Sequence, residues 1–264
     1  MADLPIIYSG PMVLAMLREI KAPGTGKTMT RRLLYSARKV PKSGGMNGVE
    51  MIAYRAPRGF VLGPDQFWSL SGWHKAKPGD RLWVRETCKA EEREDGLDGV
   101  RYLADQSWCL IENTREAADL WVDLNHYRKQ RGAVVPPIHM PRWASRLALL
   151  VTAVKIERLQ DISYDDIVAE GARSAFSQST AAIPGPAARD AWEEKAQMSW
   201  QELWGSLHSK PGTTWDDNPW VVALSFEPVL SNIDSPEMHK ERCPTCGAGV
   251  RTIFDHVAID CEAA

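Results

Sequence analysis

The stretch SRLALLVTAVKIERL, residues 145–159, is the longest apolar strand candidate in the chain. A second long strand is predicted at 220–229, WVVALSFEPV, and shorter strand patterns lie at 5–8, 78–90 and 100–105. Helical patterns separate these strands, but they do not follow a strict strand–helix–strand alternation. The sequence therefore predicts an α+β fold, a small mixed β-barrel with helices packed around it, and not a doubly wound parallel sheet.

Three helices flank the strand candidates. Ser9 is placed to cap a helix that runs to Ile20, and Pro23 follows as a stop signal. A second helix is expected at 112–130 and another at 191–208, because apolar residues recur there at helical spacing. In the 112–130 helix we expect one apolar face, formed by Leu120, Trp121 and Leu124.

A short helix is expected directly after the long strand. Ser163 with Asp166 three residues later resembles a capping box, which opens a helix. The helix runs to about Glu170, where Gly171 is placed to close it.

Length and composition limit the class of protein. At about 150 residues per domain, a chain of 264 residues is one large domain or a compact domain with appendages. Its 44% hydrophobic and 25% charged residues are typical of globular proteins and argue against a disordered or fibrous chain. The net charge of −2 means that any nucleic-acid partner must be held by a local basic patch. The N-terminal segment carries prolines and charges that fit neither a signal peptide nor a membrane span, so we expect a cytoplasmic protein.

We expect the main domain to cover 1–230. Residues 41–79 are rich in glycine and proline and predict a long irregular insertion, and 173–190 predict a mobile loop. The polar remainder, 231–264, is a C-terminal tail. Two free, buried thiols are expected in the apolar runs around Cys88 and Cys109.

The tail carries a candidate zinc site. Its first two cysteines have the C-x2-C spacing of a zinc knuckle, and two more possible ligands follow downstream. The alternative is that these are unpaired thiols in a frayed end. The four candidate ligands for a structural zinc ion are Cys243, Cys246, His256 and Cys261.

The segment GTGKTMTRR, residues 24–32, holds the first chemical candidate. GTGKT resembles the end of a phosphate-binding loop, but the full motif needs a glycine at the position of Lys21 and a strand before the loop, so we do not predict nucleotide hydrolysis. Read as a strand entrance, the segment has two faces that alternate: Thr28, Thr30 and Arg32 on one, Met29 and Arg31 on the other. Two hydroxyls and a guanidinium beside the Lys27 ammonium could bind an anion or polarise a carbonyl, whereas a solvated basic turn is the simpler alternative.

Several segments together resemble the ASCH family of PUA-like β-barrels, which are related to RNA-binding modules, and in particular its phage and prophage members. The resemblance covers most of 5–230 and does not reach the cysteine tail. It is carried by SGPMVLAMLREIKAPGTGKTMTRR (9–32), KPGDRLWVRE (77–86), HMPRWASR (139–146), LLVTAVKIERLQDISYDDIVAEG (149–171), WDDNPWV (215–221) and WVVALSFEPV (220–229).

The resemblance implies an amidohydrolase that removes the acyl group from N4-acetylcytidine, because that activity occurs in a minimal member of the family. The family pattern Lys-x-x-Thr-x-Arg is matched here by Lys27, Thr30 and Arg32. The acid of the family falls on Glu170 through a gapped alignment, and the neighbouring carboxyls Asp165 and Asp166 are the fallbacks. The implied roles are Lys27 as base, Thr30 as nucleophile and Glu170 as acid.

These roles agree with the chemistry of the side chains. A threonine hydroxyl needs a base, and a lysine can be that base if desolvation or the nearby charges of Arg31 and Arg32 lower its pKa. A carboxylic acid such as that of Glu170 can protonate the leaving exocyclic amine. An oxyanion hole is expected from backbone N–H groups of the 24–26 turn, where glycine allows close approach.

The substrate would be recognised by aromatic and polar groups. Most of the eleven tryptophans must be core residues. We nominate Trp143 and Trp220 to stack on a nucleobase, since each adjoins polar groups able to read a base edge. The full binding set is Arg32, Gly26, Trp143, Trp220 and Asn218, although the DDNP sequence around Asn218 also fits a simple turn, and His139 fits a packing residue.

Two other functions stay open. One is a non-enzymatic module that binds RNA or a modified base, with phosphates held by Lys27, Arg31, Arg32, Lys75 and Lys77. The other is a ribonuclease that shares the lysine and the glutamate. The expected partner is a modified cytosine nucleoside or base, or RNA, and not a membrane. No cofactor is expected for catalysis, so zinc in the tail would be structural.

Overall fold

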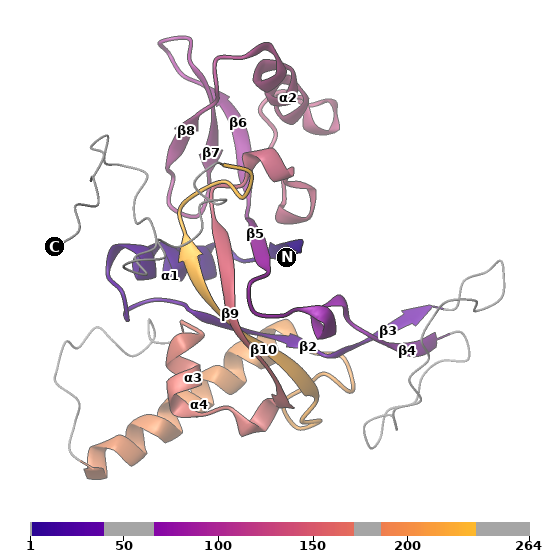
Figure 1. Ribbon diagram of the computed structural model, residues 1–264, viewed down its shortest axis with the longest axis vertical. Coiled ribbons are helices and arrows are strands. Elements are labelled where there is room, and N and C mark those ends of the chain that lie inside the picture. Colours follow the sequence, from indigo (N-terminus) through magenta and orange to yellow (C-terminus); the bar gives the residue numbers. More distant parts are fainter. Residues whose placement is uncertain (1, 40–65, 172–185, 236–264) are drawn as a thin grey trace, which may run out of the picture. The chain divides into compact units, whose positions relative to one another are not determined.

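The computed structural model describes residues 2–39, 66–171 and 186–235 (Figure 1). In these residues strands and helices are mixed in an α+β arrangement with three sheets, which confirms the predicted class. The chain forms two compact units, each built from segments that are distant in sequence. Unit 1 comprises 1–20, 80–150 and 228–264, and unit 2 comprises 21–79 and 151–227.

The largest sheet has five strands in the order β1-β5-β9-β10-β2. Its strands are β1 (Asp3–Ile7), β5 (Arg81–Arg85), β9 (Ala148–Arg158), β10 (Trp220–Val229) and β2 (Met29–Leu33). β1 pairs with β5 in parallel, whereas the pairs β5–β9 and β2–β10 are antiparallel. The order has two ends, so in the described residues its hydrogen bonds do not close into a ring. The two longest strands, β9 and β10, are the two long apolar runs predicted from the sequence.

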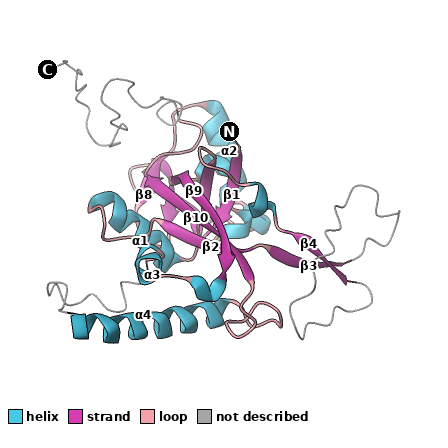
Figure 2. Cartoon of the chain, turned by 60° about the horizontal axis from the view of Figure 1, so that its bottom comes forward, coloured by secondary structure: helices cyan, strands magenta, loops and turns pink. Residues whose placement is uncertain are grey.

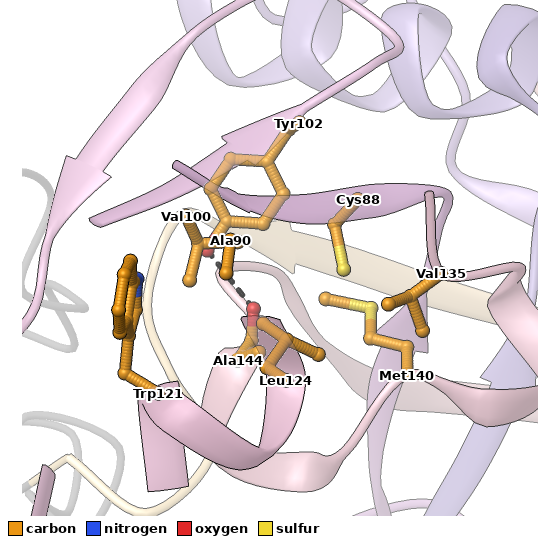
Figure 3. Close-up of a cluster of buried hydrophobic side chains, with 9 residues drawn as sticks. All are labelled: Cys88, Ala90, Val100, Tyr102, Trp121, Leu124, Val135, Met140 and Ala144. Atoms are coloured by element: carbon orange, nitrogen blue, oxygen red, sulfur yellow. Dashed lines mark hydrogen bonds between the residues drawn. The ribbon is translucent and has the colours of Figure 1, made fainter. Parts of the chain in front are cut away.

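Unit 1 contains the second sheet and its own core. The sheet has the order β6-β7-β8, from β6 (Cys88–Glu92), β7 (Asp98–Tyr102) and β8 (Trp108–Leu110). Helices α1 (Gly10–Lys21) and α2 (Arg115–Asn125) also belong to this unit, except for Lys21 at the end of α1. The core cluster drawn in Figure 3 is Cys88, Ala90, Val100, Tyr102, Trp121, Leu124, Val135, Met140 and Ala144. Its one hydroxyl is satisfied, because Tyr102 donates a hydrogen bond to the Ala144 carbonyl at 2.9 Å.

Ion pairs fasten the beginning and the end of unit 1 together. The Arg81 guanidinium binds both carboxylate oxygens of Asp3, at 2.8 and 2.9 Å. Arg142 bridges Asp3 and Asp234, and the Asn232 side chain donates to three backbone carbonyls of 142–145. The first residues of the predicted tail are therefore part of the folded unit up to Ser235.

Unit 2 places two helices beside its strands. Helices α3 (Tyr164–Ala169) and α4 (Pro186–Leu207) lie side by side in both views (Figure 2). They share an apolar cluster with the start of β10: Leu159, Ile162, Ile167, Ala196, Trp200, Trp204 and Val221. A two-stranded ribbon, β3 (Tyr35–Lys39) with β4 (Gln66–Leu70), also belongs to this unit.

Short 3-10 helices fill several connections of the chain. They are η1 (Gly72–Lys75), η2 (Tyr127–Lys129), η3 (Pro137–His139), η4 (Arg142–Ala144) and η5 (Leu159–Asp161). None of the described helices is long and apolar enough to cross a membrane.

Four predictions about local structure need correction. Leu120 is exposed, so the apolar face of α2 consists of Trp121 and Leu124 only. Cys109 is exposed because it lies on β8, at the edge of the three-stranded sheet, whereas Cys88 is buried as expected. The insertion predicted at 41–79 is not irregular throughout, since it contains β4 and η1. The loop predicted at 173–190 is also partly helical, because α4 begins at Pro186, and a proline is tolerated in the first turn of a helix.

Gly99 is required by the packing of β7 against β8. A Cβ atom at this position would lie 2.2 Å from the nearest Trp108 ring atom and 2.5 Å from the Cys109 carbonyl oxygen, both far inside van der Waals contact. We expect Gly99→Ala to lower the free energy of unfolding by about 1–3 kcal/mol through overpacking. Urea unfolding followed by tryptophan fluorescence measures the change. Gly205→Ala in α4 is the matched control, because nothing lies within 4 Å of the added methyl group, and it should leave stability equal or raise it by up to about 1 kcal/mol. Equal stability of both variants would contradict the packing argument.

Candidate functional site

The candidate site lies wholly within unit 2, where the chain enters β2. Gly26 and Lys27 are buried just before the strand. Two backbone hydrogen bonds fix this entrance: the Thr28 N–H donates to the Ala169 carbonyl at 2.8 Å, and the Thr28 carbonyl accepts from the Phe226 N–H at 2.8 Å. The end of α3 and the end of β10 thus hold the segment from two sides.

Lys27 and Glu170 meet directly although 143 positions separate them in sequence. The Lys27 Nζ lies 2.6 Å from Glu170 Oε2 and donates a second hydrogen bond of 2.8 Å to the Glu170 backbone carbonyl. Both side chains are buried, with relative exposures of 2% and 3%. The structure therefore brings together the predicted base and the predicted acid.

Local helix chemistry explains why Glu170 is at this place. The Ser163 side chain caps α3 by accepting a hydrogen bond from the Asp166 N–H at 3.1 Å, as the capping-box pattern predicts. The helix ends with Glu170 at its C-cap, and Gly171 follows with a φ of +83°, a conformation that favours glycine. Backbone hydrogen bonds from the Glu170 N–H to the Asp166 carbonyl and from the Gly171 N–H to the Val168 carbonyl thus fix the residue whose carbonyl Lys27 contacts.

Arg31 joins three carboxylates beside Lys27. Its Nε and Nη2 donate to Glu157 Oε1 at 3.0 and 2.7 Å, and Nη2 also reaches Asp166 Oδ2 at 2.6 Å. Its Nη1 lies 3.3 Å from Glu170 Oε1. The guanidinium is fully buried, while Lys155, at 2.5 Å from Glu157 Oε2, adds an exposed positive charge at the rim of the cluster.

The environment of Lys27 lowers its proton affinity. Burial lowers the pKa of Lys27, the Glu170 carboxylate opposes this effect, and the positive charges of Arg32 and Arg31 lower the pKa further. The net pKa lies below the ordinary value of 10.5. A buried amine with reduced proton affinity is the property that a lysine base requires.

Thr30 lies in the middle of β2, buried and opposite Leu224 of β10. Leu33 packs against the α3–α4 cluster and Arg31 binds α3, so strand alternation puts Thr30 and Arg32 on the other face of β2. Among the described residues its hydroxyl forms no hydrogen bond. The positive charge of Arg32, on the face of Thr30, lowers the pKa of Lys27 more than the charge of Arg31 does. Charges on both faces of β2 therefore act on the Lys27 amine.

Two of the predicted binding residues lie at the start of β10: Trp220 is the first residue of the strand, four residues before the Leu224 that pairs with Thr30, and Asn218 precedes it. Trp220 is 37% exposed, and the guanidinium carbon of Arg158 lies 4.5 Å from the centre of its ring. Asn218 has a left-handed backbone with φ of 44°, and its side-chain oxygen accepts from the Gln160 N–H at 2.9 Å. Asn218 therefore shapes a turn, as its simpler interpretation predicts, and leaves the Trp220 ring as the exposed apolar surface.

Other predicted residues have different surroundings. Trp143 belongs to unit 1, where it packs against the core cluster of that unit. In the glycine turn the Thr25 N–H donates to the Ala22 carbonyl, and Gly24 has a φ of +83°. Asp165 is exposed, whereas Asp166 binds Arg31. His139 is exposed and lies in ring contact with Tyr127.

Sequence reasoning missed Glu157. It considered Arg31 as a charge near Lys27 or as a phosphate ligand, whereas the structure places Arg31 and Glu157 together in the carboxylate cluster. A signal was present, because Lys155 and Glu157 interrupt the apolar run of the longest strand with two charges at a spacing of two.

The predicted zinc ligands Cys243, Cys246, His256 and Cys261 lie outside the described residues. In the part of the chain that the structure does describe, no group of three or more side chains is arranged as a metal site.

Comparison with known proteins gives no further assignment. No protein-family model matches the chain, and no curated protein and no solved structure matches it either.

The lowered pKa of Lys27 has a measurable effect on stability. The folded chain releases the Lys27 proton at a lower pH than the unfolded chain, so between the folded pKa and 10.5 the unfolded state binds more protons. The free energy of unfolding should therefore rise with pH in this window, relative to Lys27→Met, which removes the titrating amine and leaves Glu170 paired with Arg31. Urea unfolding of both proteins between pH 7 and 10.5 measures the difference.

Lys155→Met is the matched control for this titration. Its hydrogen bond and charge interaction with Glu157 raise the pKa of Lys155, the opposite direction to Lys27. Stability from Lys155 is therefore fully present below its unfolded pKa and lost only above it. The control should reproduce the wild-type slope below 10.5, and a slope that persists in Lys27→Met would refute the lowered pKa.

Proposed function

We propose that the protein is an amidohydrolase that removes the acyl group from N4-acylated cytosine nucleosides or bases, with Lys27 as base, Thr30 as nucleophile and Glu170 as acid. The observation that carries the proposal is the buried contact of 2.6 Å between the Lys27 amine and the Glu170 carboxylate. A lysine of reduced proton affinity, a carboxylate in contact with it and a buried threonine three residues further on supply the groups that amide hydrolysis needs.

The first half of the reaction transfers the acyl group to Thr30. The Thr30 Oγ1 attacks the acyl carbon, the neutral Lys27 amine accepts the hydroxyl proton, and a tetrahedral oxyanion forms. The short Lys27–Glu170 contact gives this proton a path to the carboxylate. When the carbon–nitrogen bond breaks, Glu170 protonates the departing N4, so that cytidine leaves as a neutral amine and the acyl group remains as an ester on Thr30.

The second half restores the enzyme. A water molecule attacks the ester carbon while Lys27 again accepts a proton, and the bond to Thr30 Oγ1 breaks as the oxygen regains its proton. The products are a carboxylic acid and the free hydroxyl. Each step uses only the three side chains and water, so the chemistry needs no metal ion, and zinc bound by the tail cysteines would have a structural role.

The proposal extends to the fold and to substrate binding. The strands of the five-stranded sheet are proposed to form the curved wall of a PUA-like barrel of the ASCH type, with the helices outside it. The exposed Trp220 ring lies four residues along β10 from Leu224, the strand partner of Thr30, so we do not propose that it stacks on a base that is bound at Thr30. Gly26, next to Lys27, and Arg32, on the same face of β2 as Thr30, are proposed to face the acyl carbonyl. Asn218 is proposed to shape the turn before Trp220.

The contacts in unit 2 favour the enzyme over a module that only binds RNA. Such a module would use Lys27 and Arg31 for phosphates, but both are buried and bound to carboxylates. Lys75 and Lys77 are exposed and Arg32 is half-buried, yet exposed charged groups of this kind each contribute little. Binding to RNA would lose affinity steeply as salt rises, whereas turnover of an uncharged nucleoside should barely respond to salt.

The test measures by chromatography how fast the protein releases cytidine from N4-acetylcytidine. Wild type should turn the nucleoside over, and Lys27→Met and Thr30→Val should each lower kcat/KM by about 10²–10⁴-fold, because each removes a group that acts in the transition state. Lys155→Met and Thr152→Val are the matched controls, since both side chains are exposed on β9, and they should retain activity.

Three results would count against the proposal. Absence of turnover in wild type would reject the activity, and full turnover in Lys27→Met would reject the lysine as base. Activity that survives in Thr30→Val but not in Lys27→Met would reject the covalent ester and assign the attack to water.

A further inference from the structure

Arg31 is the residue through which the candidate site is assembled. Its guanidinium contacts one carboxylate from β9, Glu157, and two carboxylates from the α3 segment, Asp166 and Glu170. Its Nη1 also contacts Met29 Sδ at 3.3 Å. A planar guanidinium presents its donors in a fixed fork, so these contacts set the positions of the three acids relative to β2.

The two oxygens of the Glu170 carboxylate contact different cations. Arg31 contacts Oε1 at 3.3 Å, and Lys27 contacts Oε2 at 2.6 Å. Without a partner for Oε1, the carboxylate plane could rotate about its side-chain bonds, and the atom that faces Lys27 would no longer be fixed. A positively charged group at Oε1 therefore determines which oxygen exchanges a proton with the lysine.

The arrangement also explains how Arg31 remains in place so close to another buried cation. The guanidinium and the Lys27 amine repel each other, and an unpaired buried charge costs several kcal/mol. Glu157 accepts from Nε and Nη2 of Arg31, and Asp166 accepts from Nη2, whereas Glu170 contacts Nη1. These two carboxylates do not contact Lys27 in the described structure, so they act on the lysine through Arg31.

We propose that Arg31, anchored by Glu157 and Asp166, is a positioning residue that aligns the Glu170 carboxylate with the Lys27 amine. The proposal rests on the function assigned above to Lys27 and Glu170. It goes beyond the Lys-x-x-Thr-x-Arg pattern, because Arg31 occupies one of the variable positions of that pattern, whereas Arg32 occupies the arginine position.

The charged groups around Lys27 determine the sign of the effect. From β2 they are Arg31 and Arg32, from the end of α3 Glu170 and Asp166, and from β9 Glu157 with Lys155 at its rim. His208, directly after α4, interacts with Arg32, and burial lowers its pKa. Removing the positive charge of Arg31 should therefore make Lys27 harder to deprotonate, and removing the negative charge of Asp166 should make it easier.

Direct titration of Lys27 tests this prediction. The chain is labelled with ¹³C at the lysine Cε atoms, the Lys27 signal is assigned with Lys27→Met, and NMR follows the signal as pH changes. Arg31→Met should raise the midpoint, and Asp166→Asn should lower it. The low-pH limb of kcat/KM for deacylation should move in the same direction in each variant, a shift that a purely structural role would not produce.

Arg31→Lys separates charge from geometry. A lysine keeps the positive charge but lacks the planar fork, so the Lys27 midpoint should remain near the wild-type value while kcat for deacylation falls. Arg158→Met is the matched control, because this arginine of unit 2 contacts the Asn218 carbonyl and the Trp220 ring and not the carboxylate cluster. It should leave the Lys27 midpoint unchanged.

The outcomes distinguish this inference from the proposed function. The NMR titration needs no substrate, so it decides the role of Arg31 even if wild type fails to hydrolyse N4-acetylcytidine. An unchanged Lys27 midpoint in folded Arg31→Met and Asp166→Asn would overturn the inference. If Arg31→Met does not fold, Asp166→Asn still decides, since its side chain is partly exposed at 21% and its removal buries no new charge. Shifts in the stated directions support it.

Discussion

Burial of the Lys27 amine is the constraint on which the rest of unit 2 depends. An isolated ammonium in a protein interior is strongly unfavourable, so it needs a carboxylate and further acceptors, or it loses its proton. The chain supplies both acceptors from one residue, the carboxylate and the backbone carbonyl of Glu170. The end of α3 must therefore lie against the entrance of β2, and the Thr28–Ala169 backbone hydrogen bond fixes the same contact one residue away on each side.

The same constraint gives the site its chemical character. A lysine on the surface keeps its proton at neutral pH and cannot act as a base, whereas burial and two neighbouring arginines reduce the proton affinity of Lys27. Glu170 limits this reduction, because its carboxylate stabilises the ammonium form. The protonation state of the pair is thus a balance between desolvation and one ion pair, and small changes in the surrounding charges shift it.

Local patterns predicted more of this structure than of the site. The long strand, the Ser163 cap, the Gly171 stop and the last strand depend on periodicity and on residues close in sequence, and all four are present. Side-chain exposure was less predictable, as Cys109 shows, because the edge position of its strand is a property of the whole sheet. The pairing of Lys27 with Glu170 came from a resemblance, whereas the role of Glu157 depends on which strand face meets α3, and no local pattern contains that information.

Stability alone does not account for the charges in unit 2. A buried ion pair contributes little beyond what well-packed apolar side chains of similar size would contribute, and the neighbouring cluster around Trp200 and Trp204 shows that this unit can pack such side chains. Unit 1 also buries an ion pair, Arg146 with Glu86, joined by two hydrogen bonds of 2.8 Å. There, burial acts to lower the pKa of Arg146, but the hydrogen bonds that Arg146 donates to Glu86 and Asp105 raise it, so Arg146 keeps its charge. Lys27 differs in direction, since burial lowers its pKa, and perturbed pKa values of buried titratable groups cluster at functional sites.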